Sequence, residues 1–302
     1  MTSNCSPLPT ACKHGRATAF TAALRSLVNN PEFSDVKFLV GKERREVFAH
    51  RCILACRCEV FHGMFSHHFQ RSVVKEWLEE PLVLSEVQPD VFLAVIEFLY
   101  TNCVSLNKII ALEVLTSAVE YGLNDLRKLC IEFITDTLTV ETVSEAFQAA
   151  VTFGQIDMRD KCLEFIENCT KEVVSTRGFY ELSDVALLFI LKSDHLLIDE
   201  SELLLAVREW AHVNALVLER PIAEVAKEAV REVRLFLLSP EELTKLENEN
   251  HKDNLIPVEQ IAEVWKFHAL KKWSPGAQSH LLQRRKGTRR REHHRYLNHS
   301  HK

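Results

Sequence analysis

Apolar residues between positions 112 and about 272 recur at three- and four-residue steps, the spacing of one face of a helix. The first such segment contains Leu112, Leu115, Val119, Leu123, Leu126, Leu129 and Phe133. Motifs typical of helix N-termini, a capping residue followed three positions later by an acid, occur at 142–145, 199–202 and 239–242. We therefore expect an all-α second half.

The first part of the chain has a different pattern. Residues 36–40 alternate in the manner of a strand before Gly41, and a second extended piece covers 46–50, so we expect a β-hairpin. Other short elements are expected as helices at 20–28, 52–65 and 89–99 and a strand at 81–87. A chain of 302 residues has room for two domains. We expect an α+β domain followed by an all-α domain.

Composition places the chain among globular proteins, because hydrophobic residues make up 46% and charged residues 26% of it. Apolar runs stop well short of the ~20 residues that a membrane-spanning helix needs. The first residues lack the apolar stretch of a secretory signal, so we expect an intracellular protein. Nine cysteines without any Cys-x-x-Cys pattern indicate buried thiols in a reducing compartment.

Motifs for catalysis are absent from the sequence. The eight glycines are too scattered for a phosphate-binding loop, and neither Gly-x-Ser-x-Gly nor His-Glu-x-x-His occurs. Histidines group only at 67–68, 293–294 and 299–301, in polar segments where a solvated position is favoured over a metal site. We expect no enzyme, no cofactor, no metal and no small-molecule substrate.

Charge is distributed unevenly along the chain. Residues 271–302 contain ten Lys or Arg and one acid, which leaves 27 basic and 41 acidic groups elsewhere. We expect a disordered basic tail over 273–302. Its basic run is either solvated, a nuclear-import signal, or a contact for nucleic acid or acidic membrane. No aromatic residues interleave the run, which disfavours nucleic acid. The run consists of Arg284, Arg285, Lys286, Arg289, Arg290 and Arg291.

Several separated motifs resemble, in order and spacing, those of a BTB/POZ domain: 34–36, 48–57, 64–66, 92–101 and 118–123. Later motifs resemble a BACK domain: 146–154, 162–166, 179–183, 191–194 and 202–210. The resemblance implies a BTB/POZ domain over 18–136 and a BACK helical domain over 137–272, with a disordered N-terminus over 1–17 and the basic tail over 273–302.

The resemblance also implies a symmetric homodimer in which the leading helix contacts a second copy through Phe20, Leu24, Leu27 and Val28. A short apolar helix ahead of a complete domain needs something to cover it, which supports the same expectation. Packing of this helix on its own chain stays open as the alternative.

Two further sets of residues follow from the resemblance. Members of the family that bind cullin-3 use a hydrophobic-x-Glu motif, and here Phe69 keeps the hydrophobic position while Arg71 replaces the acid. Such a charge reversal puts cullin binding in doubt. Asp35 and Arg51 match a charged pocket of BTB transcription factors, but we favour a role in completing the fold.

The resulting hypothesis is a non-enzymatic adaptor that homodimerises through its BTB domain. The alternatives are a substrate receptor of a cullin-3 RING E3 ubiquitin ligase and a nuclear co-regulator imported through the basic run. Zinc-finger spacing and kelch-like repeats are absent. A client protein would therefore bind the helical half, the tail or a groove of the dimer, in the cytoplasm or the nucleus.

Overall fold

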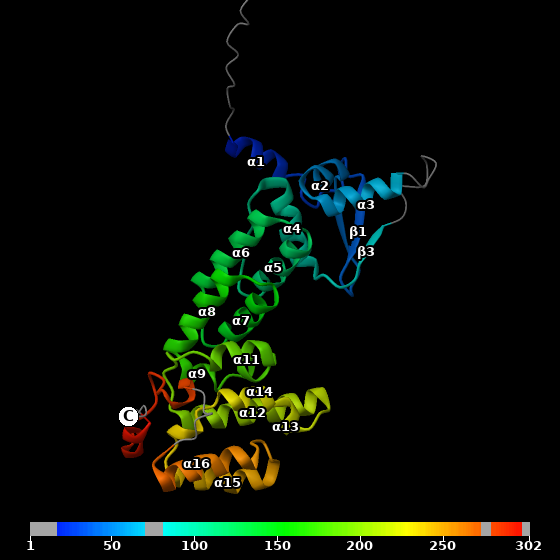
Figure 1. Cartoon of the computed structure of the whole chain (residues 1–302). Coiled ribbons are helices and arrows are strands. Elements are labelled where there is room, and N and C mark those ends of the chain that lie inside the picture. Colours follow the sequence, from blue (N-terminus) through cyan, green and yellow to red (C-terminus); the bar gives the residue numbers. More distant parts are fainter. Residues whose placement is uncertain (1–16, 70–80, 273–278, 298–302) are drawn as a thin grey trace, which may run out of the picture. The chain divides into compact units, whose positions relative to one another are not determined.

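The computed structural model describes residues 17–69, 81–272 and 279–297, with side chains described only to residue 66 in the first stretch. Contacts divide the chain into two compact units, Met1–Ile134 and Thr135–Lys302 (Figure 1). The first unit contains α1 (Ala17–Arg25), β1 (Val36–Val40), β2 (Arg45–Ala49), α2 (Arg51–Arg57), α3 (Glu59–Phe69), β3 (Leu82–Leu84), α4 (Pro89–Thr101), α5 (Ala111–Glu120) and α6 (Asn124–Asp136), whose last residues belong to the second unit.

A small sheet of strand order β2-β1-β3 forms one side of the first unit (Figure 1). Strands β1 and β2 are antiparallel, with Val36 opposite Ala49, which confirms the expected hairpin. Strand β3 pairs with β1 in parallel. Parallel pairing requires a crossover, and here helices α2 and α3 precede β3 in the chain.

Three phenylalanines from the sheet and two helices form the centre of the first core. Phe38 of β1, Phe61 of α3 and Phe92 of α4 are fully buried. The ring of Phe38 lies 5.0 Å from that of Phe92 and 6.0 Å from that of Phe61, both edge to face. Such geometry adds to the gain from burial, because the ring edge and the ring face carry opposite partial charges.

Helix α1 ends three residues earlier than the apolar pattern predicts. The hydroxyl of Ser26 donates to the carbonyl of Ala23 at 2.8 Å, and Leu27 and Val28 follow in tight turns. Asn29 then takes a left-handed conformation with φ of 50°. The expected helix over 20–28 is therefore wrong at its end, because local side-chain bonds replace the last turn.

The second unit is entirely helical where it is described, as expected. It contains α7 (Val143–Thr152), α8 (Ile156–Asn168), α9 (Thr170–Val173), α10 (Arg177–Tyr180), α11 (Asp184–Leu191), α12 (Glu200–Leu218), α13 (Ile222–Val225), α14 (Lys227–Glu232), η1 (Leu235–Leu237), α15 (Pro240–Asp253), α16 (Val258–Leu270), η2 (Ser279–Leu282) and η3 (Glu292–Tyr296). Trp210 of α12 is buried in its core and donates its indole N–H to the carbonyl of Leu182 at 2.7 Å.

Of the three predicted capping motifs, one forms a complete capping box. Ser239 and Glu242 exchange side-chain and backbone hydrogen bonds at the start of α15. Asp199 caps α12 through the Ser201 amide, while the Thr142 side chain makes no cap bond to α7. Thr142 instead bonds to residues upstream, including the backbone amide of Thr139 at 3.1 Å.

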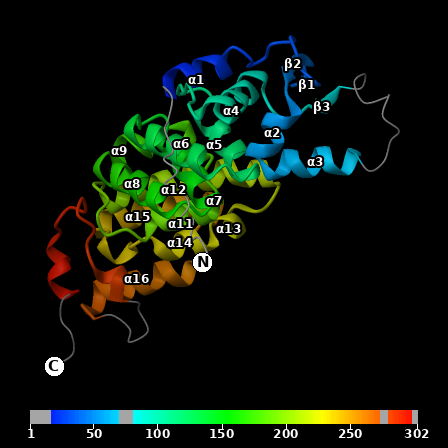
Figure 2. The same ribbon diagram turned by 90° about the horizontal axis from the view of Figure 1, so that it is seen from above.

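The expected disordered tail is wrong for residues 279–297, which we call the C-terminal strap. Figures 1 and 2 show the strap, in red, against the second unit beside α16. Arg285, His293 and His294, expected in a solvated tail, are buried. The physical reason is that acceptors elsewhere in the unit bind these side chains: Glu200 accepts from Arg285, and the Leu237 carbonyl accepts from His294. Residues 273–278 and 298–302 lie outside the described part.

Cysteines are free wherever the structure describes them, and Cys130 and Cys162 are buried as expected. Burial raises the pKa of each of these two thiols to about 12. Cys52 and Cys56 are exposed instead, because they lie on the outer face of α2. No helix in the described ranges is both long and apolar enough to cross a membrane.

Replacing Phe38 by Ala should destabilise the first unit by about 3–5 kcal/mol, because a cavity forms where three rings meet. Phe33→Ala is the control, since Phe33 is 82% exposed, and its effect should stay within about 0.5 kcal/mol. Guanidinium unfolding of the full chain, with each unit's transition fitted separately, measures both. Equal losses for the two variants would contradict this description of the core.

Candidate interaction surfaces

Helix α1 exposes most of its surface although it carries apolar residues. None of its residues is buried, and Phe20 keeps 67% of its side chain exposed. Leu24 is half-buried, and so are Leu27 and Val28 in the turn that follows. Of the four residues predicted to contact a second copy, Phe20 is thus the most open and the other three are partly covered.

The covered side of α1 faces helix α4 of its own unit. An ion pair joins Arg25 Nη1 to Glu97 Oε1 at 3.0 Å and fixes the end of α1 to α4. Packing on its own chain, the alternative left open by the sequence, therefore accounts for one side of α1. The side that carries Phe20 remains open to solvent.

Asp35 and Arg51 lie together at the start of α2, as the resemblance implies. The backbone amide of Arg51 donates to Asp35 Oδ1 at 2.7 Å, and the Arg51 Nε donates to the Asp35 carbonyl at 3.1 Å. The guanidinium also stacks over the ring of Phe65, 5.1 Å from its centroid. His50, the N-cap of α2, makes no side-chain cap bond, so Asp35 supplies that cap from the loop before β1. These contacts fit a role in completing the fold.

The predicted cullin contact falls at the edge of the described residues. Phe69 is the last residue of α3, and Arg71 lies outside the described residues. The contact therefore stays a prediction.

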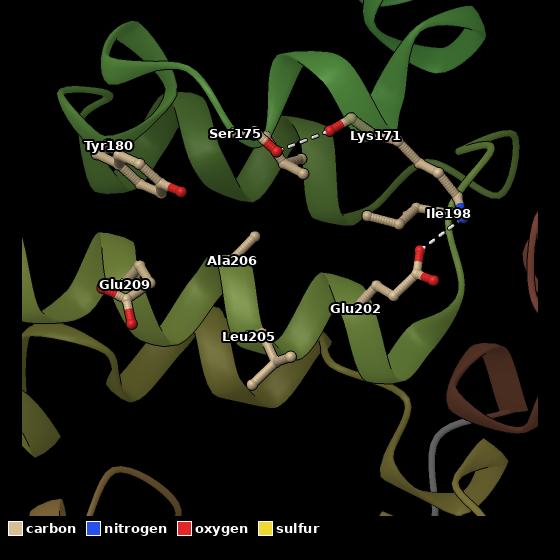
Figure 3. Close-up of a pocket in the computed structure, with 9 residues that line it drawn as sticks. Lys171, Ser175, Tyr180, Ile198, Glu202, Leu205, Ala206 and Glu209 are labelled. Atoms are coloured by element: carbon tan, nitrogen blue, oxygen red, sulfur yellow. Dashed lines mark hydrogen bonds and ion pairs between the residues drawn. The ribbon is translucent and has the colours of Figure 1, made fainter.

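A groove of about 440 Å³ opens on the second unit between α12 and the segment that holds α9 and α10 (Figure 3). Lys171 and Glu202 close one end with an ion pair of 2.8 Å. Tyr180 lies across the groove from α12, which presents Leu205 and Ala206 among other lining residues. The lining combines four apolar side chains with Tyr180, Ser175 and three charged residues, a mixture that suits a surface holding another protein segment.

A second groove, of about 240 Å³, lies between α12 and α15. Leu205 lines both grooves and is 51% exposed. One apolar side chain thus stands at the border of two hollows. The sequence pattern alone treats Leu205 as one more helix residue, so this surface was missed.

The strongest polar contacts of the second unit centre on Arg285 of the C-terminal strap, whose side chain is 0% exposed. Its Nε donates to Glu200 Oε2 at 3.1 Å, and its other nitrogens donate to the carbonyls of Leu191, Ser193 and Glu232. Leu191 and Glu232 are the last residues of α11 and α14. Arg285 therefore satisfies the free carbonyls at two helix ends and neutralises a buried carboxylate.

Asp199, the N-cap of α12, binds the strap through both carboxylate oxygens. It accepts from the Arg289 amide at 2.7 Å and from Arg291 Nη2 at 2.8 Å. Arg291 also pairs with Glu242 of α15. Burial alone raises the pKa of Asp199, but the bonds from Arg291, Arg289 and Ser201 outweigh it and lower that pKa to about 2.

Three histidines form hydrogen bonds with three consecutive backbone carbonyls at the end of η1. Each Nε2 lies within 3.1 Å of its acceptor: His293 with Phe236, His294 with Leu237 and His268 with Leu238. A carbonyl only accepts, so each Nε2 carries the proton.

On its other ring nitrogen, Nδ1, His294 lies 3.4 Å from the Arg291 amide, as an acceptor does. Neutral His294 therefore uses both ring nitrogens, Nε2 as a donor and Nδ1 as an acceptor. Protonation would turn Nδ1 into a second donor and break its bond with the Arg291 amide. Burial, together with the neighbouring His294 and His268, lowers the pKa of His293 to about 4. The pKa values of His268 and His294 are lowered for the same leading reason.

The predicted import run is divided by these contacts. Arg285 is buried and Arg291 is 11% exposed. The other four, Arg284, Lys286, Arg289 and Arg290, are exposed. No local signal in the sequence separates the two sets, because the partner of Arg285 lies 85 positions away. Within the described ranges, no three His, Cys, Asp or Glu residues form a group that could hold a metal.

Comparison with known proteins agrees with this architecture. The BTB/POZ domain family model matches residues 24–138, and the model described as "BTB And C-terminal Kelch" (BACK) matches 143–248. The chain therefore belongs to the BTB/POZ family, as a member with a BACK domain, which makes it a protein-binding adaptor.

Particular relatives extend this match over nearly the whole chain. The chain is 57% identical to BTB/POZ domain-containing protein 19 of Bos taurus over 284 residues, covering 94% of this chain and 96% of that protein. The Homo sapiens protein of that name is 56% identical over the same shares. BTB/POZ domain-containing protein 9 of Homo sapiens is 28% identical over 81% of this chain and 38% of that protein. The family resemblance of the sequence is thus confirmed.

Replacing Arg285 by Ala should destabilise the second unit by about 3–5 kcal/mol, because Glu200 then keeps a buried charge without its cation. Arg290→Ala is the matched control, since Arg290 is exposed in the same strap, and it should change stability by less than about 0.5 kcal/mol. Denaturant unfolding of the full chain measures both. Similar small losses would show that the buried pair contributes little.

Acid should weaken the second unit through His293. Its folded pKa of about 4 lies below the unfolded value of 6.5, so the unfolded chain takes up a proton first as the pH falls. This contribution to stability is complete above pH 6.5 and is lost toward pH 4. At about 1.4 kcal/mol per pKa unit, it reaches at most about 3–4 kcal/mol.

His293→Gln keeps a donor for the Phe236 carbonyl but does not titrate in this range. The unfolding free energy of the variant should therefore change less between pH 6.5 and pH 4 than that of the unaltered chain. Urea unfolding at several pH values in this window measures the difference. Identical pH profiles for the two chains would rule out His293 as the titrating group.

Proposed function

We propose that the chain is a homodimeric, non-enzymatic scaffold: two copies associate through α1 of the first unit, and each second unit presents a surface for a client protein. The observation that supports the dimer most directly is the exposure of Phe20 on a helix without any buried residue. A helix of nine residues is marginal by itself and gains most of its stability from packing. A second copy that covers Phe20 would supply that packing.

For the client surface, the supporting observation is Leu205 between the two grooves of α12. An exposed leucine with hollows on both sides suits an apolar ridge or short helix of a partner, while Lys171, Glu202 and Glu209 would orient it through charge. Adaptors need two separate surfaces, and here each unit carries one.

Receptor function for a cullin-3 ligase depends on Phe69 and Arg71, so it stays a separate prediction. Import as a nuclear co-regulator depends on the basic run, and the burial of Arg285 and Arg291, two of its six residues, opposes its function as a linear signal. We therefore favour the scaffold.

Phe20→Asp should weaken self-association, because a charge on the central apolar contact must be desolvated in the dimer. Loss of a central contact of about 2 kcal/mol or more raises the dimer Kd by at least about 30-fold. Light scattering of the full chain across a concentration series measures the effect. Leu216→Asp is the control, since Leu216 is 82% exposed but belongs to the second unit.

Two results would contradict the proposed dimer. One is an unaltered chain that stays monomeric at tens of micromolar, a concentration at which weak dimers still form. The other is a Phe20→Asp chain that dimerises as tightly as the Leu216→Asp chain.

A further inference from the structure

The C-terminal strap is held in a way that differs from ordinary core packing. Only two of its apolar side chains, Leu282 and Leu297, are buried. Most of its contacts are hydrogen bonds and ion pairs in which the strap donates and the rest of the unit accepts. A segment held by polar contacts can leave without exposing a large apolar surface to water.

The acceptors all belong to elements outside the strap. They are the carbonyl ends of α11 and α14, the carboxylates at the start of α12 and α15, and the carbonyls of η1. A fixed cavity of acceptors that closes on one guanidinium is what selective recognition of an arginine requires. Lysine could not bridge four acceptors in several directions, because its charge sits on a single nitrogen.

Gly287 gives the site a second requirement. The backbone of the strap comes so close that a Cβ built on Gly287 would lie 2.2 Å from the Ile198 nitrogen and 2.5 Å from the Leu197 carbonyl carbon. The amides of Lys286 and Gly287 donate to the carbonyls of Asp194 and Leu196, both at 2.9 Å. Any residue larger than glycine would push the strap off these carbonyls.

Side-chain and backbone contacts together define a spacing. An arginine enters the cavity, a glycine follows two positions later, and a second arginine six positions after the first pairs with Asp199 and Glu242. A cavity for one arginine, a position that only glycine fits and a separate ion pair together allow a site to recognise one peptide segment.

We propose that the second unit contains a peptide-binding site for an arginine-bearing segment of this spacing, and that the chain's own C-terminal strap occupies the site as a displaceable ligand. The site consists of the ends of α11 and α14, the start of α12 and α15, and η1. While the strap is bound, the amides of residues 286, 287 and 289 are engaged. The basic run is then withheld from any receptor that reads it as an extended chain.

The test is binding in trans. Full-length chain carrying Gly287→Ala keeps every charge but cannot seat its own strap, so its site should bind a labelled synthetic peptide of residues 279–297. The control chain carries Gly63→Ala, where a Cβ meets nothing within 4 Å, and its site stays filled by a tethered competitor at millimolar effective concentration. Anisotropy titration should give at least about 30-fold tighter binding to the Gly287→Ala chain.

A second peptide with Arg285→Ala tests what the site recognises. Loss of its binding to the Gly287→Ala chain supports the proposal. Equal binding of the two peptides, or equal binding of the first peptide to both chains, overturns it.

Hydrogen exchange of the unaltered chain covers the case in which Gly287→Ala fails to fold. A displaceable strap opens by itself, so its amides at 286, 287 and 289 should lose protection at a lower denaturant concentration than the amides of α12. Loss of protection in the strap and in α12 at the same denaturant concentration would mean that the strap is an inseparable part of the fold, and would overturn the proposal.

Discussion

A unit built from short helices buries many helix ends, and every buried carbonyl or amide at those ends needs a partner. The second unit meets this constraint with side chains that reach across the fold. Arg285 donates hydrogen bonds to the last carbonyls of α11 and α14, and the three histidines donate to the carbonyls at the end of η1. Trp210 donates to the carbonyl of Leu182. Local caps such as Ser239 satisfy only some of these helix ends. These long-range bonds complete the unit alongside its apolar contacts.

The elements that sequence analysis predicts well are those whose cause is local. Alternation over residues 36–40 and the capping box at Ser239 depend on neighbours within a few positions, and the structure has both. The end of α1 was missed because the Ser26 hydroxyl bonds back to Ala23 and Asn29 takes a left-handed conformation, and periodicity registers neither. Thr142 shows the converse, since the right spacing forms no capping box.

The site is less predictable for the same reason. A basic run looks solvated when its acidic partners lie far away in the sequence, as Glu242 lies 49 positions from Arg291 and Glu200 lies 85 positions from Arg285. Asp35 and Arg51 were placed together only by resemblance, and their bonds join the residue before β1 to the first residue of α2. Leu205 has no sequence signal at all, because its importance comes from the hollows on either side of it.

The ion pair between Glu200 and Arg285 can form only late in the synthesis of the chain. A ribosome adds residues from the N-terminal end, so α12 is complete long before its partner arginine is made. During that interval the first turn of α12 holds a carboxylate that must stay hydrated, and the ends of α11 and α14 have no donor from the strap. The strap can therefore dock only after chain growth has passed residue 285, when its donors replace the water bound at these groups.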